Sequence, residues 1–190
     1  MAGHLQAELY RKSIHVATSA IPLAYHFFLD KSIVLYICLF LAAGFWTADL
    51  LRIKFSLVER YFLRIFSNLL REREVQHGIT GATLLFTGIT LAVWWYPQQA
   101  AVPAILFLTL ADPAAAVIGR HYGRDRFFNK SIEGALAFYL AAALIVLTLT
   151  TYSWWGLVIA LVMAGVEFLP VPVDDNLTIP VIGGYLFMVI

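Results

Sequence analysis

The feature that most constrains this chain is a series of long apolar segments separated by short polar ones. A membrane-crossing helix needs roughly 17–25 residues, and seven segments approach that length. They are Ser13–Leu29, Ser32–Leu51, Ile79–Tyr96, Ala100–Ile118, Ala135–Thr151, Trp154–Leu169 and Asp174–Ile190. Of the 190 residues, 61% are hydrophobic and 13% are charged, about half the charged fraction of a soluble domain. The sequence therefore predicts an all-α integral membrane protein, a single domain over residues 1–190 with about seven transmembrane helices, some of them broken or short.

Basic residues are concentrated on one side of the predicted membrane. If the seven spans alternate in direction, Lys31 is the only one of the 13 Lys and Arg residues on the other side. The positive-inside rule makes the basic side cytoplasmic. The acidic residues follow the basic ones, with Asp30 as the exception. We therefore expect an active site at the cytoplasmic interface.

Residues 55–74, between the second and third spans, have the pattern of an amphipathic helix. Phe55, Val58, Phe62 and further apolar residues recur at helical spacing, and charged and polar residues occupy the other angles. We expect this helix to lie in the membrane interface with its basic side near the lipid headgroups. It is either an anchor alone or a platform under which a lipid headgroup is handled.

Asp112 stands inside an apolar segment and is followed directly by Pro113. A residue before proline is pushed away from the α-helical region. We therefore expect the fourth span to break at Asp112, which would cap a new helical segment opened by Pro113. Ionisable residues in spans tend to face cavities or partners, so Asp112 is a candidate functional residue. The alternative is a protonated packing aspartate.

Residues 119–134 combine glycines with basic side chains and end on Lys130 and Ser131, where the next span opens. Glycine lets the backbone approach a phosphate closely, cations neutralise the phosphate, and the free N–H groups of a helix start bind anions. The segment is therefore a candidate phosphate site. An ordinary positive-inside loop has the same composition.

Asp174 and Asp175 open the last span, after two prolines that end the preceding helix. Adjacent carboxylates without a basic neighbour in sequence repel each other and need a cation or protons. Hard oxygen ligands of this kind suit Mg²⁺, which takes one or two carboxylates together with substrate phosphates. We expect one of the two aspartates to be a metal ligand and the other to cap the helix.

At the start of the first span, Arg11 and His15 are four residues apart and share a helix face. Arg11 and Lys12 are either flanking charges that set the topology or part of a site. His15 is either a proton carrier or a hydrogen-bonded packing residue.

Four segments of the chain resemble, in the same order, the signature segments of the CTP-dependent lipid kinase family. This family includes dolichol and polyprenol kinases, phytol kinases and yeast-type diacylglycerol kinases. The segments are ELYRKSIH (8–15), EVQHGITGATLLFTG (74–88), DPAAAVIGRHYGR (112–124) with NKSIEGALAF (129–138), and EFLPVPVDDNLTIPVIGG (167–184). The resemblance implies a membrane-embedded catalytic domain that transfers the γ-phosphate of CTP to the hydroxyl of a membrane lipid alcohol at the cytoplasmic face. The acceptor would be a polyprenol or dolichol, a phytol-like isoprenoid or a diacylglycerol.

The resemblance and the chemistry of phosphoryl transfer, which needs mainly positioning and charge neutralisation, give the candidate site residues. Those expected to bind the nucleotide are Arg11, Lys12, Gly119, Arg120, Lys130, Ser131 and Asn176. Those expected to hold one or two Mg²⁺ ions are Asp112, Asp174 and Asp175. The catalytic candidates are Asp112, Lys130, His15 and Glu133, with an aspartate, His15 or Glu133 as the base that accepts the alcohol proton.

Two alternatives stay open. The family is also similar to CDP-diacylglycerol synthases, so a cytidylyltransferase that uses CTP and Mg²⁺ on a lipid phosphate is the first. An ion-coupled transporter would also bury acids near broken helices, but we would then expect polar groups in both halves of the membrane. The outer halves have few, with His26 and Asp30 as exceptions.

The partners and the location follow from the kinase interpretation. We expect nucleotide and lipid-alcohol substrates, surrounding membrane lipids and no nucleic acid, and a homodimer is compatible with a core of this size. The membrane would be the cell membrane in a prokaryote, or the endoplasmic reticulum or plastid membrane in a eukaryote.

Overall fold

The computed structural model describes residues 2–67, 70, 74–75, 78–124, 126–127 and 130–190, and most of them are helical. The elements are α1 (Ala2–Thr18), α2 (Ala20–Phe27), α3 (Lys31–Lys54), α4 (Ser56–Phe66), α6 (Gly81–Trp95), α7 (Gln98–Leu106), the π-helical turn η2 (Phe107–Ala111), α8 (Asp112–Tyr122), β1 (Arg126–Phe127), β2 (Lys130–Ser131), α9 (Ile132–Leu149), α10 (Ser153–Phe168) and α11 (Asp175–Met188). The two short strands form an antiparallel pair. The predicted all-α class is confirmed.

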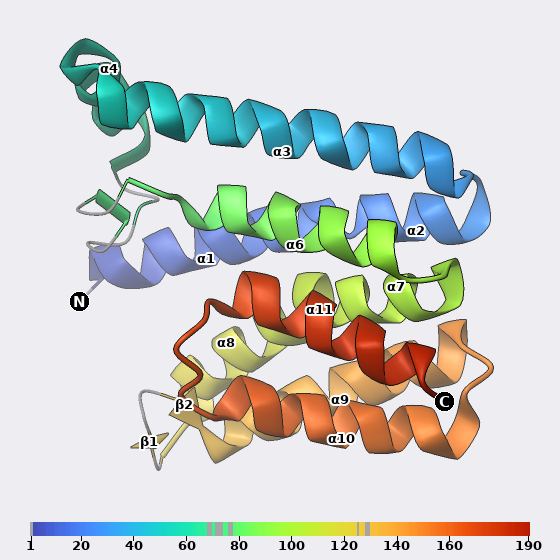
Figure 1. The fold of residues 1–190 in the computed structure, drawn as a ribbon. Coiled ribbons are helices and arrows are strands. Elements are labelled where there is room, and N and C mark those ends of the chain that lie inside the picture. Colours follow the sequence, from blue (N-terminus) through green and yellow to red (C-terminus); the bar gives the residue numbers. More distant parts are fainter. Residues whose placement is uncertain (1, 68–69, 71–73, 76–77, 125, 128–129) are drawn as a thin grey trace.

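In the described part of the chain, seven helical rods run roughly along one direction (Figure 1). They are α1–α2, α3, α6, α7–η2–α8, α9, α10 and α11, and α4 is not one of them. Among the described residues, three helices are long and apolar enough to cross a membrane: Lys31–Lys54, the continuous Gln98–Tyr122, and Ile132–Leu149. Gly81–Trp95 and Trp154–Phe168 are apolar but shorter. The predicted mixture of long and short apolar helices is therefore confirmed.

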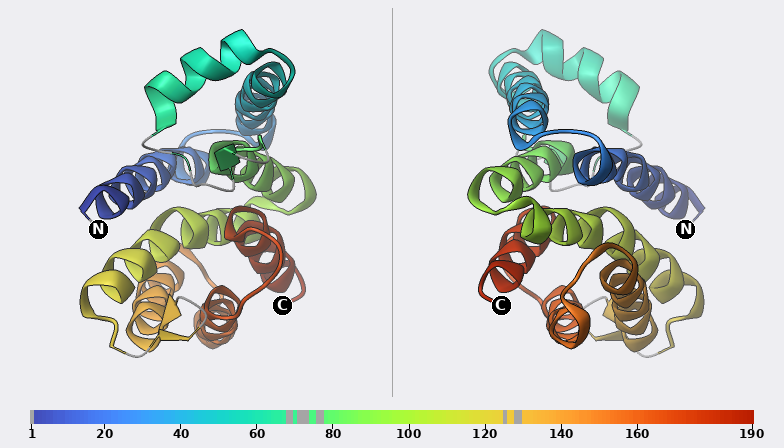
Figure 2. Two further views of the ribbon diagram at one scale, coloured as in Figure 1. Left: turned by 90° about the vertical axis from the view of Figure 1, so that its left-hand side faces the viewer. Right: turned by 90° about the vertical axis from the view of Figure 1, so that its right-hand side faces the viewer.

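The rod α7–η2–α8 is the centre of the fold. In the most apolar 18-residue stretch of this rod, 72% of the residues are buried, against 22% in the corresponding stretch of α3 and 28% in that of α9. Phe107, in the π turn, packs edge-on against Phe138 of α9 and Phe187 of α11, with ring centroids 6.0 and 5.6 Å apart. In the views of Figure 2, α3 and α4 lie on one side of this rod and α9, α10 and α11 on the other.

The prediction that the fourth span breaks at Asp112 is wrong, because the helix is deformed before this residue but continues through it. Asp112 has α-helical angles (φ −63°, ψ −43°), and its N–H donates to the carbonyl of Phe107, five residues back. The deformation is thus a wide turn placed before the proline. Proline has no N–H and its ring crowds the carbonyl of the preceding turn, and a π turn gives that carbonyl room. Asp112 therefore remains inside a continuous rod and does not act as an extended cap.

The described part of the predicted amphipathic segment forms α4, which has no buried residue. It leaves Leu57, Tyr61 and Ile65 exposed and stands beyond the end of α3 (Figures 1 and 2). Residues 68–69 and 71–73 of that segment lie outside the described residues. The position of α4 in a membrane interface stays a prediction.

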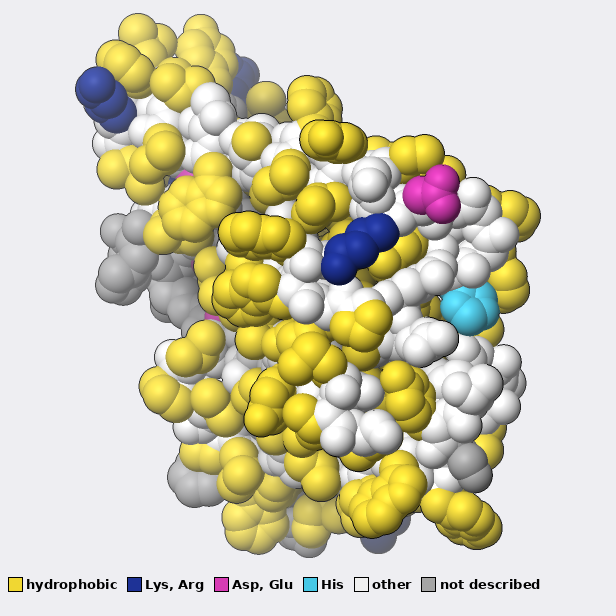
Figure 3. Space-filling model, turned by 45° about the vertical axis from the view of Figure 1, so that its right-hand side comes forward, with side chains coloured by type: hydrophobic (Ala, Val, Ile, Leu, Met, Phe, Trp, Pro, Cys, Tyr) yellow, Lys and Arg dark blue, Asp and Glu magenta, His cyan; other side chains and the backbone are white. Residues whose placement is uncertain are grey.

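Charged residues are segregated along the rods. The half of the fold that contains α4, β1, β2 and the start of α1 holds Lys12, Asp112, Lys130, Glu167 and Asp175, and we call it the charged half. Hydrophobic side chains dominate the face shown in Figure 3, where charged groups are sparse. Such a surface suits contact with lipid chains.

A close helix contact provides a test of this packing. At Gly88, in α6, a Cβ atom would collide with the backbone carbonyl of Asn176 and approach the Pro180 ring to 2.9 Å. We expect Gly88→Ala to lower the free energy of unfolding by about 1–3 kcal/mol, the usual effect of overpacking. Gly44→Ala is the matched control, because nothing lies within 4 Å of that position, and alanine there should be neutral or stabilising by up to about 1 kcal/mol. Thermal unfolding in detergent measures both, and equal stability of the two variants would contradict the packing.

Candidate active site

Five chain segments bring acids and bases together inside the charged half. Lys12 and His15 come from α1, Asp112 from the start of α8, and Lys130 from β2. Glu167 comes from the end of α10 and Asp175 from the start of α11. We call these six residues the acid–lysine cluster. Because Asp112 is the first of the 11 residues of α8, the cluster lies about three helical turns inside the end of that rod.

Asp112 is the most enclosed carboxylate of the cluster, with 5% of its surface exposed. Lys12 donates a hydrogen bond of 2.5 Å from Nζ to its Oδ2 atom, and Nδ1 of His15 lies 3.6 Å from the same oxygen. Nδ1 of His15 is buried and has no hydrogen-bond partner. Since an isolated buried carboxylate is unfavourable, the contact with Lys12 stabilises the Asp112 side chain in this enclosed position.

Lys130 joins the two carboxylates that come from α10 and α11. Its Nζ lies 3.1 Å from Oε1 of Glu167 and 3.0 Å from Oδ2 of Asp175, and it also donates to the Glu167 carbonyl. Burial lowers the pKa of Lys130, but the two carboxylates outweigh it, so the pKa lies above the ordinary lysine value. The ammonium is therefore charged at physiological pH, and it links α10 and α11 through the hairpin that precedes α9.

The three carboxylates can converge on one ion. Oxygen atoms of Asp112, Glu167 and Asp175 lie within 4.8 Å of one another. An octahedral Mg²⁺ at about 2.1 Å keeps its ligands roughly 3–4 Å apart, so small side-chain movements bring these oxygens into range. The donor set fits a hard divalent cation, with Glu167 in place of the expected Asp174.

Asp174 caps α11 in this arrangement, because its Oδ1 accepts a hydrogen bond of 3.1 Å from the N–H of Asn176. The expected division into one cluster acid and one capping acid therefore matches the geometry. Asn176 is buried, and its side-chain amide donates to the carbonyl of Gly81, at the start of α6. Its contact with a nucleotide stays a prediction.

Arg11 and Arg120, both expected to bind the nucleotide, meet at a third residue. Glu8, on α1, pairs with Arg11, and its Oε2 lies 3.1 Å from Nη2 of Arg120. The Arg120 side chain is 41% exposed. These arginines lie on the same two elements as Lys12 and Asp112, and Arg120 is about two helical turns along α8 from Asp112.

The glycine and serine of the central segment have structural partners. Ser131 is the N-cap of α9, where its Oγ accepts from the N–H of Gly134. A Cβ at Gly119 would lie 2.9 Å from that Oγ and 3.2 Å from Cα of Gly134. Gly119 thus lets α8 and α9 approach closely, and nucleotide contacts by Gly119 and Ser131 stay predictions.

Glu133 lies in the first turn of α9, outside the acid–lysine cluster. Its Oε1 accepts a hydrogen bond of 3.2 Å from the N–H of Arg124. This contact supports the loop between α8 and the hairpin. A role for Glu133 as base remains untested.

The sequence interpretation missed Glu167 and Glu8 as site residues. Glu167 lies eight positions before Asp175, and a segment with Pro170 and Pro172 turns the chain back between them. That pattern places the end of one helix beside the start of the next. It is the sequence feature from which Glu167 could have been predicted to lie near Asp175. Nothing comparable in the sequence joins Glu8 to Arg120.

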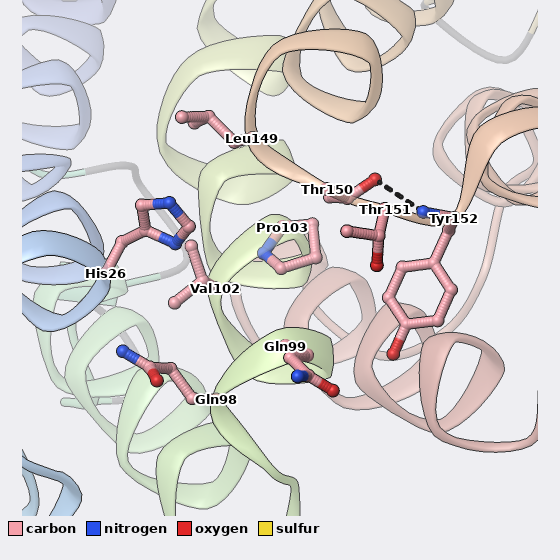
Figure 4. A pocket seen from close by; sticks show the side chains of 9 residues that line it. All are labelled: His26, Gln98, Gln99, Val102, Pro103, Leu149, Thr150, Thr151 and Tyr152. Carbon is pink, nitrogen blue, oxygen red and sulfur yellow. Dashed lines mark hydrogen bonds between the residues drawn. The ribbon is translucent and has the colours of Figure 1, made fainter.

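A pocket with a volume of about 270 Å³ lies at the opposite end of the rods from the acid–lysine cluster. Figure 4 shows His26 from α2 on one side of it and the loop Thr150–Tyr152 on the other, with Gln98 and Gln99 at the base. It contains none of the predicted site residues. The α7–η2 residues that lie between it and Asp112 are mainly apolar and buried.

Comparison with known proteins places this geometry in context. An uncharacterized protein of Methanocaldococcus jannaschii is 30% identical over 185 residues, which are 94% of this chain and 92% of that protein. CTP-dependent diacylglycerol kinase 1 of Schizosaccharomyces pombe is 25% identical over 165 residues, 76% of this chain and 75% of that protein. A phytol kinase of Synechocystis is 35% identical over 88 residues, 40% of this chain and 38% of that protein. No family model and no solved structure matches the chain.

Apolar helices around a largely enclosed cluster of acids and lysines, together with relatives that are kinases of lipid alcohols, define a membrane phosphotransferase whose acceptor is an alcohol group. The chain belongs to the family of CTP-dependent lipid kinases, as the resemblance of its four segments predicted.

The ion pairs of Lys130 give a test that needs no substrate. In Lys130→Met the Glu167 and Asp175 carboxylates lose their shared cation, and we expect a loss of about 2 kcal/mol in stability, because the pair is partly exposed and screened. A divalent cation should restore part of that loss, since it can replace the ammonium charge between the acids. Thermal unfolding with and without MgCl₂ measures this, and Lys54→Met, at an exposed position, is the control. A Mg²⁺ effect on Lys130→Met no larger than on the control would contradict the cluster.

Proposed function

We propose that this protein, as one membrane-embedded catalytic domain, transfers the γ-phosphate of CTP to the hydroxyl of a membrane lipid alcohol at the cytoplasmic face. The observation that carries the proposal is the acid–lysine cluster: three carboxylates and two lysines from five segments, enclosed among apolar helices on the Asp112 side and partly exposed at Lys130 and Asp175. Kinase relatives that act with CTP on diacylglycerol support the donor and the type of acceptor. The concentration of Lys and Arg on one side supports the cytoplasmic face.

In this proposal the cationic side chains bind the triphosphate. Lys130, which holds Glu167 and Asp175 together, and Lys12, which holds Asp112, turn from carboxylate to phosphate oxygens when the nucleotide arrives. Arg11 and Arg120 neutralise the rest of the triphosphate from positions around Glu8. Phosphoryl transfer needs this kind of charge neutralisation and positioning and little covalent participation by the protein.

Asp112, Glu167 and Asp175 would hold Mg²⁺, which when bound neutralises the charge that develops on the transferring phosphoryl group. The alcohol oxygen forms a bond to the γ-phosphorus as the bond from that phosphorus to the β–γ bridging oxygen breaks, and CDP leaves. The alcohol proton passes to a base. Among the candidates, His15 has a buried Nδ1 without a partner, 3.6 Å from Asp112, and this geometry favours it over Glu133.

The lipid alcohol has a route along α1. Leu9, Tyr10 and Ile14 are exposed on the helix that carries Lys12 and His15. A lipid chain lying against these side chains can place its hydroxyl near the cluster without crossing the membrane. This arrangement suits an acceptor with a long apolar chain and a small polar end.

The two other interpretations differ in their products. A cytidylyltransferase would release pyrophosphate from CTP and phosphatidate, whereas a kinase releases CDP. A carrier would need polar groups through both halves of the membrane, and the described residues Val102–Leu108 of the central rod are apolar and buried. The kinase is the interpretation that the geometry supports best.

A panel of lipid alcohols tests the donor and the acceptor. Purified protein receives γ-labelled CTP or ATP with a polyprenol, phytol or diacylglycerol, and the lipid is extracted and counted. We expect label in at least one lipid alcohol with CTP, and CDP as the nucleotide product. Pyrophosphate release with phosphatidate in place of labelled alcohol would favour the cytidylyltransferase, and ion-coupled uptake into vesicles without nucleotide would favour the carrier.

Asp112→Asn tests the role of the buried acid. The change removes a negative charge at a site that we expect to bind Mg²⁺, and loss of one preorganised electrostatic group costs about 100-fold or more in turnover. Asp30→Asn, at an exposed position at the start of α3, is the matched control and should retain activity. Lipid phosphorylation with labelled CTP is the measurement, with thermal unfolding as the check on folding, and near-normal turnover of Asp112→Asn would discard the assignment.

A further inference from the structure

A second buried charge pair joins α3 to the start of α6. The Oδ2 atom of Asp49 accepts three hydrogen bonds from α6: 2.8 Å from the N–H of Thr80, 3.0 Å from the Thr80 hydroxyl and 2.5 Å from the Thr83 hydroxyl. Thr80 is the N-cap of α6. Asp49 therefore places a carboxylate at the N-terminus of this helix, where the helix dipole makes a negative charge stabilising. This contact fixes where α6 begins.

Arg52 completes this junction from one helical turn further along α3. Its Nη2 lies 3.4 Å from Oδ1 of Asp49 and donates to the carbonyl of Gly78. Gly78 has a φ of 80°, and a Cβ there would collide with Ile53, so the turn requires glycine. The guanidinium also lies 4.8 Å from the ring centre of Phe62, which belongs to α4.

Stability alone does not account for this pair. Asp49 and Arg52 are each only 2% exposed, and removing two charges from water costs about as much as their attraction returns. An apolar contact would join α3 to α6 as well, as other residues of the two helices do. A buried pair of this kind is best explained by the single geometry that its hydrogen bonds enforce.

That geometry extends to the acid–lysine cluster through one hydrogen bond. The carbonyl of Gly81, next to Thr80, accepts from the side-chain amide of Asn176 at 3.1 Å. Asn176 follows Asp175 in the first turn of α11. This hydrogen bond joins the start of α6 to the start of α11, at the residue that follows Asp175.

We propose that Asp49 and Arg52 are positioning residues for the catalytic site, which act through Thr80, Gly81 and Asn176 to hold Asp175 at the distance from Asp112 and Glu167 that a divalent cation requires. The inference rests on the proposed function in so far as the three carboxylates bind that cation. Neither residue touches the cluster itself. Their effect is on the affinity for the metal, and the transfer chemistry belongs to other residues.

The test compares two variants at the same helix interface. Asp49→Asn removes the charge that orders the start of α6. Trp46→Phe removes a different α3–α6 hydrogen bond, from Nε1 of Trp46 to Oγ1 of Thr87 at 3.0 Å, two turns further along α6 from Thr80. Mn²⁺ binding to the purified protein with CDP present and no lipid alcohol, followed by electron paramagnetic resonance, is the main readout, because phosphate oxygens are needed to draw Lys12 and Lys130 from the carboxylates. The Mg²⁺ concentration that gives half-maximal lipid phosphorylation is the second.

We expect Asp49→Asn to weaken Mn²⁺ binding about 10-fold, the effect typical of residues that orient metal ligands, and to raise the half-maximal Mg²⁺ concentration by a similar factor. Trp46→Phe should change neither. Equal Mn²⁺ affinity of Asp49→Asn and the unmodified protein would overturn the inference, and so would an equal loss in Trp46→Phe. If the unmodified protein with CDP binds no more Mn²⁺ than CDP does alone, the metal role of the cluster fails as well, and this is visible before any variant is compared.

Thr83→Val provides a second route if Asp49→Asn does not fold. It removes one hydrogen bond to Asp49 and leaves the Asp49–Arg52 pair in place. A weaker loss of Mn²⁺ affinity in the same direction, about 3-fold, is the expected result. Unchanged affinity in a folded Thr83→Val protein would count against the inference.

Discussion

Three carboxylates that lie close together among apolar helices repel one another. The surrounding elements are placed so that lysine side chains offset this repulsion. Lys12 neutralises Asp112 from α1, and Lys130 neutralises Glu167 and Asp175 from the hairpin before α9. Without these lysines the carboxylates would have to take up protons or another cation, because like charges that are close together and partly buried are unfavourable. The same lysines can release the carboxylates to a metal ion when phosphate oxygens are there to receive them. The same carboxylates and lysines would thus neutralise one another in the free protein and bind the metal–nucleotide complex when it is present.

The membrane class, the expected concentration of charge at one end and most of the cluster could be predicted from the sequence, because each depends on local patterns. Apolar length predicts the rods, and an aspartate within an apolar segment predicts a functional acid at Asp112. The division of Asp174 and Asp175 into one cap and one cluster acid follows from helix-start chemistry. Charge pattern and family resemblance together indicated Lys12 and Lys130, whose partners in space no spacing rule specifies.

The misses have physical causes of a different kind. Glu167 and Glu8 acquire their meaning from tertiary contacts, across a proline-containing turn in one case and between α1 and α8 in the other. The preference of a residue before proline for extended angles is a local rule, and it was overridden at Asp112 by a wide turn that the buried packing of Phe107 holds in place. The Asp49–Arg52 pair likewise depends on how α3 meets α6.

The π turn has a consequence for the direction in which the site faces. A π turn contains one residue more than an α-helical turn, and each residue of a helix advances the angle by about 100°. Everything on α8 is therefore rotated by about that angle, relative to α7, from where an unbroken α-helix would carry it. The extra residue within Phe107–Ala111 works as a phase shift: it lets α7 keep its apolar faces toward α6 and α11 while Asp112 faces Lys12. Without it, the same amino acids in the same order would aim the carboxylate at a different neighbour.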